Sequence, residues 1–374
     1  MRRFLPAAFA SAAVLLFVAL TAQVYNPPVA GGSGTVTSVI CGNGLSGGTI
    51  TTTGTCAISA ALTPQGRLTL TTATPVMAAD ALAQTTVFYD CYAGNVVPVG
   101  ATPALLTIAS CEISMGLDAV TPHIASGSVY DIFGVSNAGV LALCAGPAWT
   151  STTARGSGAG TTQIDQTVGG LWTNTVSLTH CWGGASGTTD LGAVAAHAGT
   201  YLGSVEATAN GQTAMAFKPA AASGGTNNFL ALYNAYNRVA YVARSRDSTA
   251  SWTLSNNSVT FRAANASNSN RITYLDGLGQ SVAKGYYKVL VLTASVSTGS
   301  SNNGVDFDST SATPNNIGQE NLGGTSTHSQ IHADDSLISL GLHFAQAVES
   351  NQASSTSTFF GSANGQELRL EVMQ

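Results

Sequence analysis

The segment THSQIHADD (327–335) holds four side chains of metal-binding types within eight residues, at His328, His332, Asp334 and Asp335. Imidazole and carboxylate groups are common metal ligands, and three converging chains would multiply them. The H-x3-H spacing places both histidines on one face of a helix, but glycine, serine and threonine surround this segment. We therefore expect a polar, exposed loop, and predict no metal and no other cofactor.

Two carboxylates lie two residues apart in GVDFDST, at Asp306 and Asp308. From an extended strand both side chains would point the same way, so they could bind calcium or carry out acid–base chemistry on a glycan. Glycoside cleavage requires a second carboxylate at a defined separation, and the sequence does not locate one. No catalytic residue is assigned from this pair.

Two glycine-rich segments match catalytic motifs by letter alone. ARGSGAGTT (154–162) contains GxGxG but lacks the preceding strand and following helix of a phosphate-binding loop. GLSGG (44–48) places Ser46 at the nucleophile position of GxSxG, yet a threonine-rich strand follows where a nucleophile elbow requires a helix. We interpret the first as a surface loop and the second as a hairpin turn, so the chain is not expected to be an enzyme.

The four tryptophans are Trp149, Trp172, Trp182 and Trp252. Indole rings can form a sugar-binding surface by stacking, but in β-domains most tryptophans lie partly buried in a core or an interface. The core interpretation is favoured for each of them, with carbohydrate contact as the alternative.

Composition limits the classes of function. Of 374 residues only 8% are charged, against about 25% in ordinary soluble domains, while 44% are hydrophobic and 41 are glycine. The polar surface must therefore consist of serine, threonine, asparagine, glutamine and glycine, as in secreted adhesins, capsid proteins and phage fibres. The net charge is −5, and neither a basic patch nor a basic run is present, so nucleic acid is not an expected partner.

All six cysteines lie in the first half of the chain, and none forms a CxxC pair. They are either buried free thiols or disulfides formed outside the cell. Cys41 and Cys56 lie on the two arms of an expected hairpin, and a bond between them would close a loop of about 15 residues, worth on the order of 3 kcal/mol. Free thiols packed at an oligomer axis remain the alternative for this pair.

The N-terminus begins with a hydrophobic segment (1–24), in which Arg2 and Arg3 precede an apolar stretch from Leu5 to Ala22. It fits a secretory signal peptide cleaved near Ala22, a membrane anchor, or an uncleaved peg inserted into a larger assembly. A helix is expected there. A linker rich in proline and glycine follows and opens a second region, 25–65.

Period-2 alternation predicts an all-β fold, a β-sandwich or jelly-roll-like head, over residues 66–374, with a C-terminal subunit from about 281. In SLISLGLHFAQAV (336–348) we expect Leu342 and Phe344 on the core face and Ser339 and His343 on the other. YYKVLVLTASV (286–296) is suited to a strand buried on both faces, and FLALYNAYNRVAYVA (229–243) to one helix or two strands. The other expected strands are 67–72, 85–92, 129–136, 140–145, 175–182, 200–208 and 367–372.

The segment GTVTSVICGNGLSGGTITTTGTCAIS (34–59) consists of two threonine-rich runs around a glycine-rich turn, which predicts a β-hairpin. Its apolar stripe is thin, and an isolated two-stranded hairpin is marginal in water. A further chain should cover the stripe, so we expect homotrimerisation into a fibre shaft.

This segment resembles the recurring GTVTSV…GTGLSGGTITTTGT segment of phage and prophage tail-fibre and adhesin proteins. Further similar pieces lie between residues 34 and 280, namely GRLTLTTATPVMAAD, GPAWTSTTARGSGAGTTQ, GLWTN, ATANGQT, SRDSTASWT and RAANASNSNRITYLDGLG. The N-terminal hydrophobic segment and the final 90 or so residues depart from the pattern.

The resemblance implies a homotrimeric structural fibre on the virion exterior that attaches to a host surface glycan or protein and contacts other virion proteins through its N-terminal segment. It supplies no catalytic residues to transfer. The alternative is an exported or membrane-anchored bacterial surface adhesin of prophage origin, and a glycan-cleaving fibre is the third hypothesis.

Overall fold

The structure is a computed structural model that describes residues 38–40, 45–46, 49–54, 57–58, 63–101, 103–120, 123–158, 160–167, 170–255, 260–294, 300–312, 318–321, 327–351 and 356–374. Contacts divide the chain into two units, Met1–Ala60 and Ala61–Gln374. The second is called the β-rich unit below. The helix expected in 1–24 and the predicted disulfide partners Cys41 and Cys56 lie outside the described residues.

The first unit contains two short antiparallel strand pairs. β1 (Val39–Ile40) pairs with β3 (Thr49–Ile50), and β2 (Leu45–Ser46) pairs with β4 (Ala57–Ile58). The β1–β3 pairing agrees with the expected hairpin. However, Ser46 was expected in a turn and instead lies in a strand, while Thr51–Thr53 form a bend that interrupts the second threonine-rich run.

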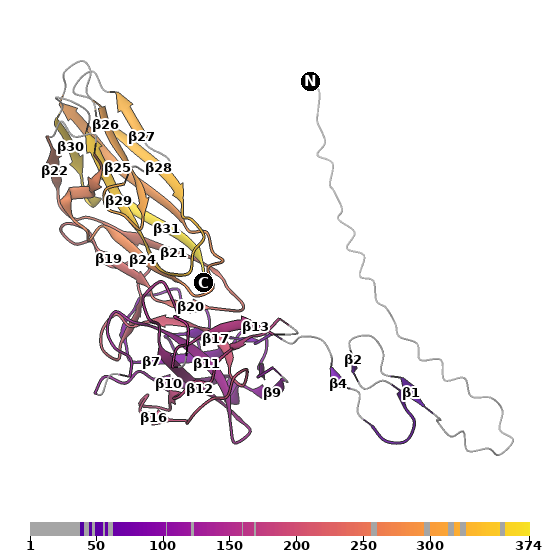
Figure 1. The fold of residues 1–374 in the computed structure, drawn as a ribbon. Helices are drawn as coiled ribbons and strands as arrows, with labels where there is room; N and C mark the ends of the chain where they lie inside the picture. Colours follow the sequence, from indigo (N-terminus) through magenta and orange to yellow (C-terminus); the bar gives the residue numbers. More distant parts are fainter. Residues whose placement is uncertain are drawn as a thin grey trace, which may run out of the picture. The chain divides into compact units, whose positions relative to one another are not determined.

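The β-rich unit has no α-helix in its described residues, and its only helical elements are the short 3-10 turns η1 (Ala109–Cys111), η2 (Ala264–Ala266) and η3 (Ser362–Asn364). The region 229–243, for which a helix and strands were both considered, forms strands. Among the described residues we find no helix with the length and apolar character of a membrane span. The fold is thus all-β (Figure 1).

The first eight-stranded sheet has the order β13-β14-β17-β11-β12-β15-β16, with β20 paired to β17. Its strands are β11 (Val129–Asn137), β12 (Val140–Ala148), β13 (Ile164–Gln166), β14 (Trp172–Asn174), β15 (Trp182–Gly183), β16 (Thr189–Asp190), β17 (Thr200–Glu206) and β20 (Leu232–Asn234). All pairings are antiparallel. The strand expected over 175–182 is largely irregular, and only its last residue enters β15.

The second eight-stranded sheet has the order β27-β26-β29-β24-β19-β18-β6, with β23 paired to β29. Its strands are β6 (Ala81–Gln84), β18 (Thr213–Met215), β19 (Asn227–Leu230), β23 (Arg262–Ala263), β24 (Arg271–Asp276), β26 (Ser300–Phe307), β27 (Gly318–Asn321) and β29 (Gly341–Asn351). β19 and β24 run parallel, while the other pairs in this sheet are antiparallel.

The six-stranded sheet has the order β21-β31-β25-β30-β22, with β28 paired to β25. Its strands are β21 (Ala240–Ser245), β22 (Ser251–Leu254), β25 (Lys284–Ala294), β28 (Thr327–Asp335), β30 (Thr356–Phe360) and β31 (Glu367–Met373). β28 covers the segment for which a polar loop was predicted, so that prediction was wrong. The long register with β25, from Lys284↔Asp335 to Leu292↔Thr327, supplies the ladder hydrogen bonds that override the polar composition.

Two smaller sheets complete the unit. β5 (Gly66–Thr69), β7 (Thr86–Cys91) and β10 (Glu112–Gly116) form a three-stranded antiparallel sheet, and β8 (Val96–Val99) pairs with β9 (Ala104–Thr107). Arg67 of β5 is fully buried and donates hydrogen bonds to backbone carbonyl oxygens of Pro75, Asn237 and Gln374. A buried guanidinium with several acceptors thus connects distant parts of the chain.

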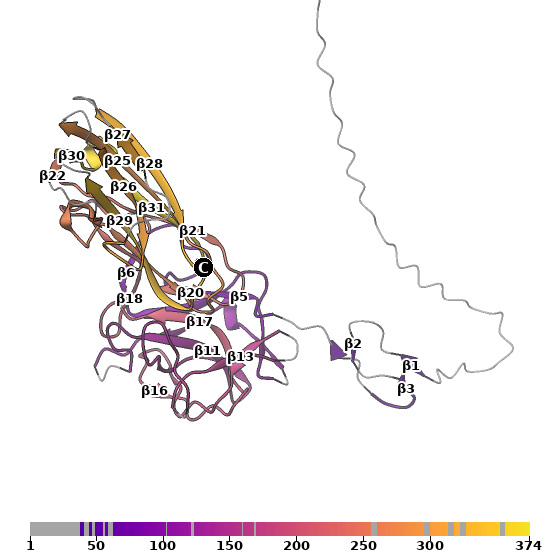
Figure 2. The ribbon, with the colours of Figure 1, turned by 45° about the horizontal axis from the view of Figure 1, so that its top comes forward.

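One hydrophobic core joins the second eight-stranded sheet to the six-stranded sheet. Ala345 and Ala347 of the former and Val289 and Val291 of the latter are fully buried in the same cluster. Figures 1 and 2 show strands of the two sheets alongside one another from both viewing angles. Burial alternates along β25, with Val289 buried and Lys288 exposed. The expectation that this strand is buried on both faces was therefore wrong.

β29 begins only at Gly341, where φ is +126°, a backbone angle that side-chain-bearing residues rarely adopt. The face predicted for this strand was wrong at its start. His343 is buried at 6% exposure, whereas Leu342 and Phe344 are partly exposed. The chain thus turns sharply just before His343 and directs its imidazole inward.

Candidate functional site

Asp306 and Asp308, the two carboxylates considered as a pair, are separated by backbone conformation. Asp306 lies in β26, is 7% exposed, and accepts a hydrogen bond at Oδ2 from the Ala312 N–H at 3.0 Å. Burial raises the pKa of Asp306 above its ordinary value. Asp308 follows the strand with a φ of +57°, which turns its side chain toward β29. The pair therefore does not converge on one calcium ion or one glycan.

The four residues considered as metal ligands, His328, His332, Asp334 and Asp335, lie on β28. Asp334 is buried and Asp335 is exposed, so these neighbouring carboxylates lie on opposite faces of the strand. The side chains of His328 and His332 lie outside the described part of the structure. Among side chains that are described, no three His, Cys, Asp or Glu residues converge closely enough to hold a metal ion.

Three of the four tryptophans are buried or partly buried and pack within the protein. Trp149 is 5% exposed beneath the Arg155 guanidinium, whose Cζ lies 4.3 Å from the ring centroid. Trp252 is 7% exposed and donates its Nε1–H to Glu349 Oε2 at 2.8 Å. Trp172 is partly buried against the hydrophobic cluster that includes Phe133 and Tyr201.

The segment 154–162 is not simply a surface loop, because Arg155 lies inside the protein. Its guanidinium forms a two-point ion pair with Asp131, at 2.7 Å and 3.0 Å, and donates to the Gly277 carbonyl at 2.6 Å. Asp131 also accepts a hydrogen bond from Ser204 Oγ at 2.7 Å. The arrangement fixes the loop to β11 and β17 and offers no phosphate cradle.

Trp182 differs from the other tryptophans because two imidazole rings stack on it. The His123 centroid lies 3.5 Å from that of Trp182 at an interplanar angle of 10°, and the His180 centroid lies 5.3 Å away at 18°. Each histidine has a carboxylate partner: His123 Nδ1 lies 2.8 Å from Asp118 Oδ2, and His180 Nδ1 lies 2.6 Å from Asp190 Oδ2. We call these five residues the ring-stack site.

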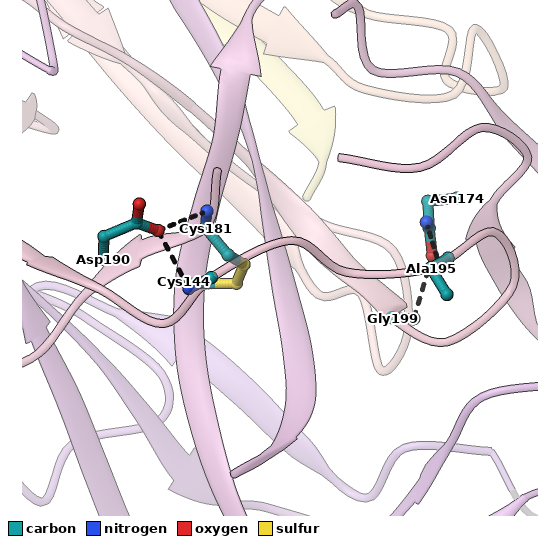
Figure 3. Close-up of a disulfide and its surroundings, with 7 residues drawn as sticks. Cys144, Asn174, Cys181, Asp190, Ala195 and Gly199 are labelled. Carbon is teal, nitrogen blue, oxygen red and sulfur yellow. Dashed lines mark hydrogen bonds between the residues drawn. A yellow bond between two sulfur atoms is a disulfide. The ribbon is translucent and has the colours of Figure 1, made fainter. Parts of the chain in front are cut away.

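A disulfide anchors the ring-stack site. Cys144 of β12 and Cys181, which directly precedes Trp182, are bonded and fully buried, with their Cα atoms 5.2 Å apart. Asp190 Oδ1 accepts the Cys181 N–H at 3.5 Å and the Gly192 N–H at 2.9 Å (Figure 3). The carboxylate that pairs with His180 is therefore held by the backbone around the disulfide.

A cavity of about 190 Å³ lies beside the segment that follows Asp190. It is lined by Val135, Ser136, Asn137, Leu191, Ala193, Val194, Ala195 and Ala198. Its wall is fixed by the fully buried Asn174, whose Nδ2 donates to the Ala195 carbonyl at 2.8 Å while its Oδ1 accepts the Gly199 N–H at 2.8 Å (Figure 3). Leu191 links the cavity to the ring-stack site, because it follows Asp190 directly.

The ring-stack site presents both hydrogen-bonding and aromatic groups to solvent. The side chain of His180 is 55% exposed and that of Asp190 33% exposed. The hydrogen bond from His180, with those from the backbone, lowers the pKa of Asp190, so this carboxylate is ionised at neutral pH. The His123 ring covers part of the Trp182 indole and leaves less of it open for stacking. A ligand at this site would therefore be held mainly by polar contacts. Such a surface can bind hydroxyl-rich or amide-bearing ligands.

A second constellation joins Asp308, His343 and Ser339. His343 Nδ1 lies 2.8 Å from Asp308 Oδ2, and His343 Nε2 lies 3.2 Å from Ser339 Oγ and 3.1 Å from the Ser339 carbonyl oxygen. The other Asp308 oxygen accepts the Phe344 N–H at 3.0 Å. The carboxylate and the hydroxyl thus contact opposite nitrogens of one imidazole.

Sequence reasoning missed the histidines of both constellations and Ser339 as a polar partner. HCW (180–182) carried a usable signal, since residues two apart in an extended chain point the same way. Nothing local indicated that His123 would reach Trp182. The contact between Ser339 and His343 depends on the turn at Gly341, and Asp308 arrives through the pairing of β26 with β29.

The structure also provides two of the disulfides left open from the sequence, Cys91–Cys111 and Cys144–Cys181. Comparisons of the chain with protein-family models, with curated proteins and with solved structures found no match.

Proposed function

We propose that this chain is a structural fibre protein of a phage virion that attaches the particle to its host. In this proposal the first unit contributes to a homotrimeric shaft, the hydrophobic N-terminal segment contacts other virion proteins, and the β-rich unit is the head. The function requires no catalysis, metal or cofactor, and its partner is a host surface glycan or protein.

The ring-stack site carries the proposal. Trp182 and His180 lie next to a buried disulfide, so the polar and aromatic groups they present are held on a rigid support. Preorganised side chains bind with a smaller loss of conformational entropy than mobile ones. Three such sites on one trimer would gain avidity from their effective concentration.

Two further observations support an extracellular particle protein. Two disulfides fit an oxidising environment, because cytosolic proteins rarely keep them. The low charge content and the all-β fold are both common in proteins that remain outside cells. We further propose that the second eight-stranded sheet and the six-stranded sheet, which share a core, form a β-sandwich of jelly-roll-like type.

The trimeric shaft is supported by exposed apolar side chains in the first unit. Val39 is 51% and Ile40 73% exposed in β1, a strand of two residues paired only with β3 among the described residues. Two-residue strands have little stability alone, so association with copies of the same segment would protect them. Light scattering after size exclusion should give a trimer for residues 25–374. A monomer would contradict the shaft.

Attachment is tested by measuring binding to purified host-envelope glycans and to host cells. We expect the pair of changes Trp182→Ala and His180→Ala to weaken binding at least tenfold while leaving the circular dichroism spectrum unchanged. Tyr92→Ala is the matched control, because Tyr92 is an exposed aromatic residue, at 47%, outside the ring-stack site. Equal binding by the double variant and the control would contradict the proposed surface.

The second candidate is an exported or membrane-anchored bacterial surface adhesin of prophage origin, which the same disulfides also favour. The two candidates differ in where the chain is found. Detection in purified virus particles supports the fibre, whereas recovery only from the cell-envelope fraction supports the surface adhesin.

A further inference from the structure

Asp308, His343 and Ser339 are held in the order that nucleophilic catalysis requires. Asp308 contacts Nδ1 of the imidazole at 2.8 Å, and Ser339 Oγ lies 3.2 Å from Nε2. In hydrolytic triads the carboxylate holds Nδ1–H, and Nε2 accepts the hydroxyl proton of the nucleophile. Such triads are recognised by geometry and roles, and they recur in unrelated folds with different chain orders.

The base and the nucleophile also differ in their degree of burial. His343 is 6% exposed, whereas Ser339 is exposed and reachable from solvent. The imidazole is therefore fixed by its surroundings while the hydroxyl remains open to a substrate. A nucleophile on an exposed loop beside a fixed base meets the positional requirement for covalent catalysis.

Asp308 is held by the backbone as well as by His343. Its N–H donates to the Phe344 carbonyl at 3.0 Å, and its Oδ1 accepts the Phe344 N–H at 3.0 Å. Its φ of +57° is uncommon for a residue with a side chain and costs about 1 kcal/mol or more. Both contacts direct Oδ2 at the imidazole, so Asp308 is a positioning residue.

The loop before β29 offers groups that a substrate could use. Within the described part of the chain, the backbone N–H groups of residues 337–340 donate to no protein acceptor, so the loop holds unused donors of the kind that an oxyanion hole requires. Leu337 is 85% and Ile338 58% exposed, directly before the nucleophile. An apolar acyl or alkyl group can contact these two side chains.

We propose that Ser339, His343 and Asp308 form a hydrolytic triad that cleaves small carboxylic esters with a short apolar substituent. This activity is independent of the attachment function and departs from the sequence-based expectation that the chain is not an enzyme. The exposed position suits an ester that projects from a larger molecule, since no deep cleft has to enclose it.

The reaction balances with water as the second substrate. Ser339 Oγ attacks the ester carbonyl carbon while its proton moves to His343 Nε2, and the resulting oxyanion collapses with transfer of that proton to the departing alkoxide. Water then attacks the acyl-Ser339 ester, gives a proton to Nε2, and the acid is released as Ser339 regains its proton. One ester and one water become one acid and one alcohol.

The carbonyl oxygen of Ser339 competes for the same nitrogen, because it lies 3.1 Å from Nε2. A protonated imidazole donates Nε2–H to this carbonyl and cannot act as a base, whereas a neutral imidazole with its proton on Nδ1 accepts from Oγ. The rate should therefore rise with pH as His343 loses its proton. The groups facing His343 are Asp308, Asp276 and the Tyr274 ring, whose centroid lies 5.6 Å away.

The test measures hydrolysis of 4-nitrophenyl acetate and butyrate by the full chain, and labelling by a fluorophosphonate probe followed by peptide mass spectrometry. We expect labelling at Ser339 and a loss of about a hundredfold or more in rate for Ser339→Ala and for His343→Gln. Ser311→Ala, an exposed serine on the turn after β26, should keep the full rate.

Asp308→Asn tests the positioning role separately, because it should move the midpoint of the pH–rate profile to lower pH as well as lowering the rate. Equal hydrolysis by wild type and Ser339→Ala, or labelling only at another serine, would overturn the proposal. Absence of both hydrolysis and labelling in folded wild-type protein would overturn it as well, and would leave His343 as a structural clasp between Asp308 and the 336–340 loop.

Discussion

Asp308 and His343 are 35 residues apart in the chain, yet the Asp308 carboxylate lies 2.8 Å from His343 Nδ1. Burial has the largest single effect on the pKa of His343 and lowers it. The hydrogen bond and charge of Asp308, together with the Ser339 carbonyl, outweigh burial and raise the pKa above its ordinary value of 6.5. The histidine is therefore protonated more readily in the folded chain than in the unfolded one.

The first prediction concerns this balance. In Asp308→Asn the charge is lost while burial remains, so the pKa of His343 should be lower than in the wild type. In the wild type, the protonated imidazole stabilises the fold fully below pH 6.5, and this contribution is lost as the pH rises through the raised folded-state pKa. An NMR titration of the imidazole Hε1 signal measures both values, and an unchanged pKa in the variant would contradict the assigned cause.

A second prediction concerns Glu206, at the end of β17. Its side chain is 6% exposed, its Oε2 has no hydrogen-bond partner in the described residues, and burial raises its pKa from 4.5 to about 7. The folded state therefore holds a proton that the unfolded state releases, so stability falls as the pH rises from 4.5 to about 7.

Glu206→Gln should remove this pH dependence. At pH 8 the variant should be more stable than the wild type by up to about 3 kcal/mol, and at pH 4 the two should be similar. Urea unfolding at several pH values measures the difference. Parallel stability curves for the two proteins would show that the carboxyl group is not the source.

A third prediction concerns the Cys144–Cys181 disulfide, which spans 37 residues. Replacing both cysteines with serine should lower the free energy of unfolding by roughly 3–4 kcal/mol, since the unfolded chain regains loop entropy. The matched control replaces Cys91 and Cys111, which span 20 residues. Both variants should lose stability, but only the first should also lose ligand binding at Trp182, because that tryptophan follows Cys181.

The buried ion pair of Asp131 and Arg155 gives the fourth prediction. Asp131→Asn leaves Arg155 buried without its counter-charge and should destabilise the fold by about 3–5 kcal/mol. The double change Asp131→Leu with Arg155→Met should cost less than the two single changes combined, because no charge then remains uncompensated. Urea unfolding of the wild type, Asp131→Leu, Arg155→Met and the double variant completes the cycle, and strictly additive losses would mean that the two side chains are not coupled.

Local patterns predicted several elements well. β31 alternates in the expected way, with Leu368, Leu370 and Val372 buried, because one face of that strand is polar and the pattern is visible in the sequence. β29 was predicted less well. Its polar residues Gln346 and Glu349 are fully buried, and the partners of Glu349 are Arg262 and Trp252, which no local pattern indicates.

The candidate sites were harder to predict for a similar reason. A serine four residues before a histidine is common in any β-protein, and only the turn at Gly341 brings this pair together. Asp308 was identified as a candidate, but for chemistry shared with Asp306. The contact that it makes depends on register between β26 and β29, which is a property of the assembled sheet.

The position of β31 has a consequence for how the chain folds. β31 lies between β21 and β25 and pairs with both, although it is synthesised long after them. Until β31 emerges from the ribosome, β21 lacks its partner in this sheet, and residues 284–288 of β25 lack one of their two partners. Pairing β31 with strands so distant in the sequence is slow, because closing a long connection costs conformational entropy. We therefore expect nascent or truncated chains lacking residues 367–373 to aggregate more readily than the full chain, and chaperones that cover exposed strand edges to raise the yield of folded protein.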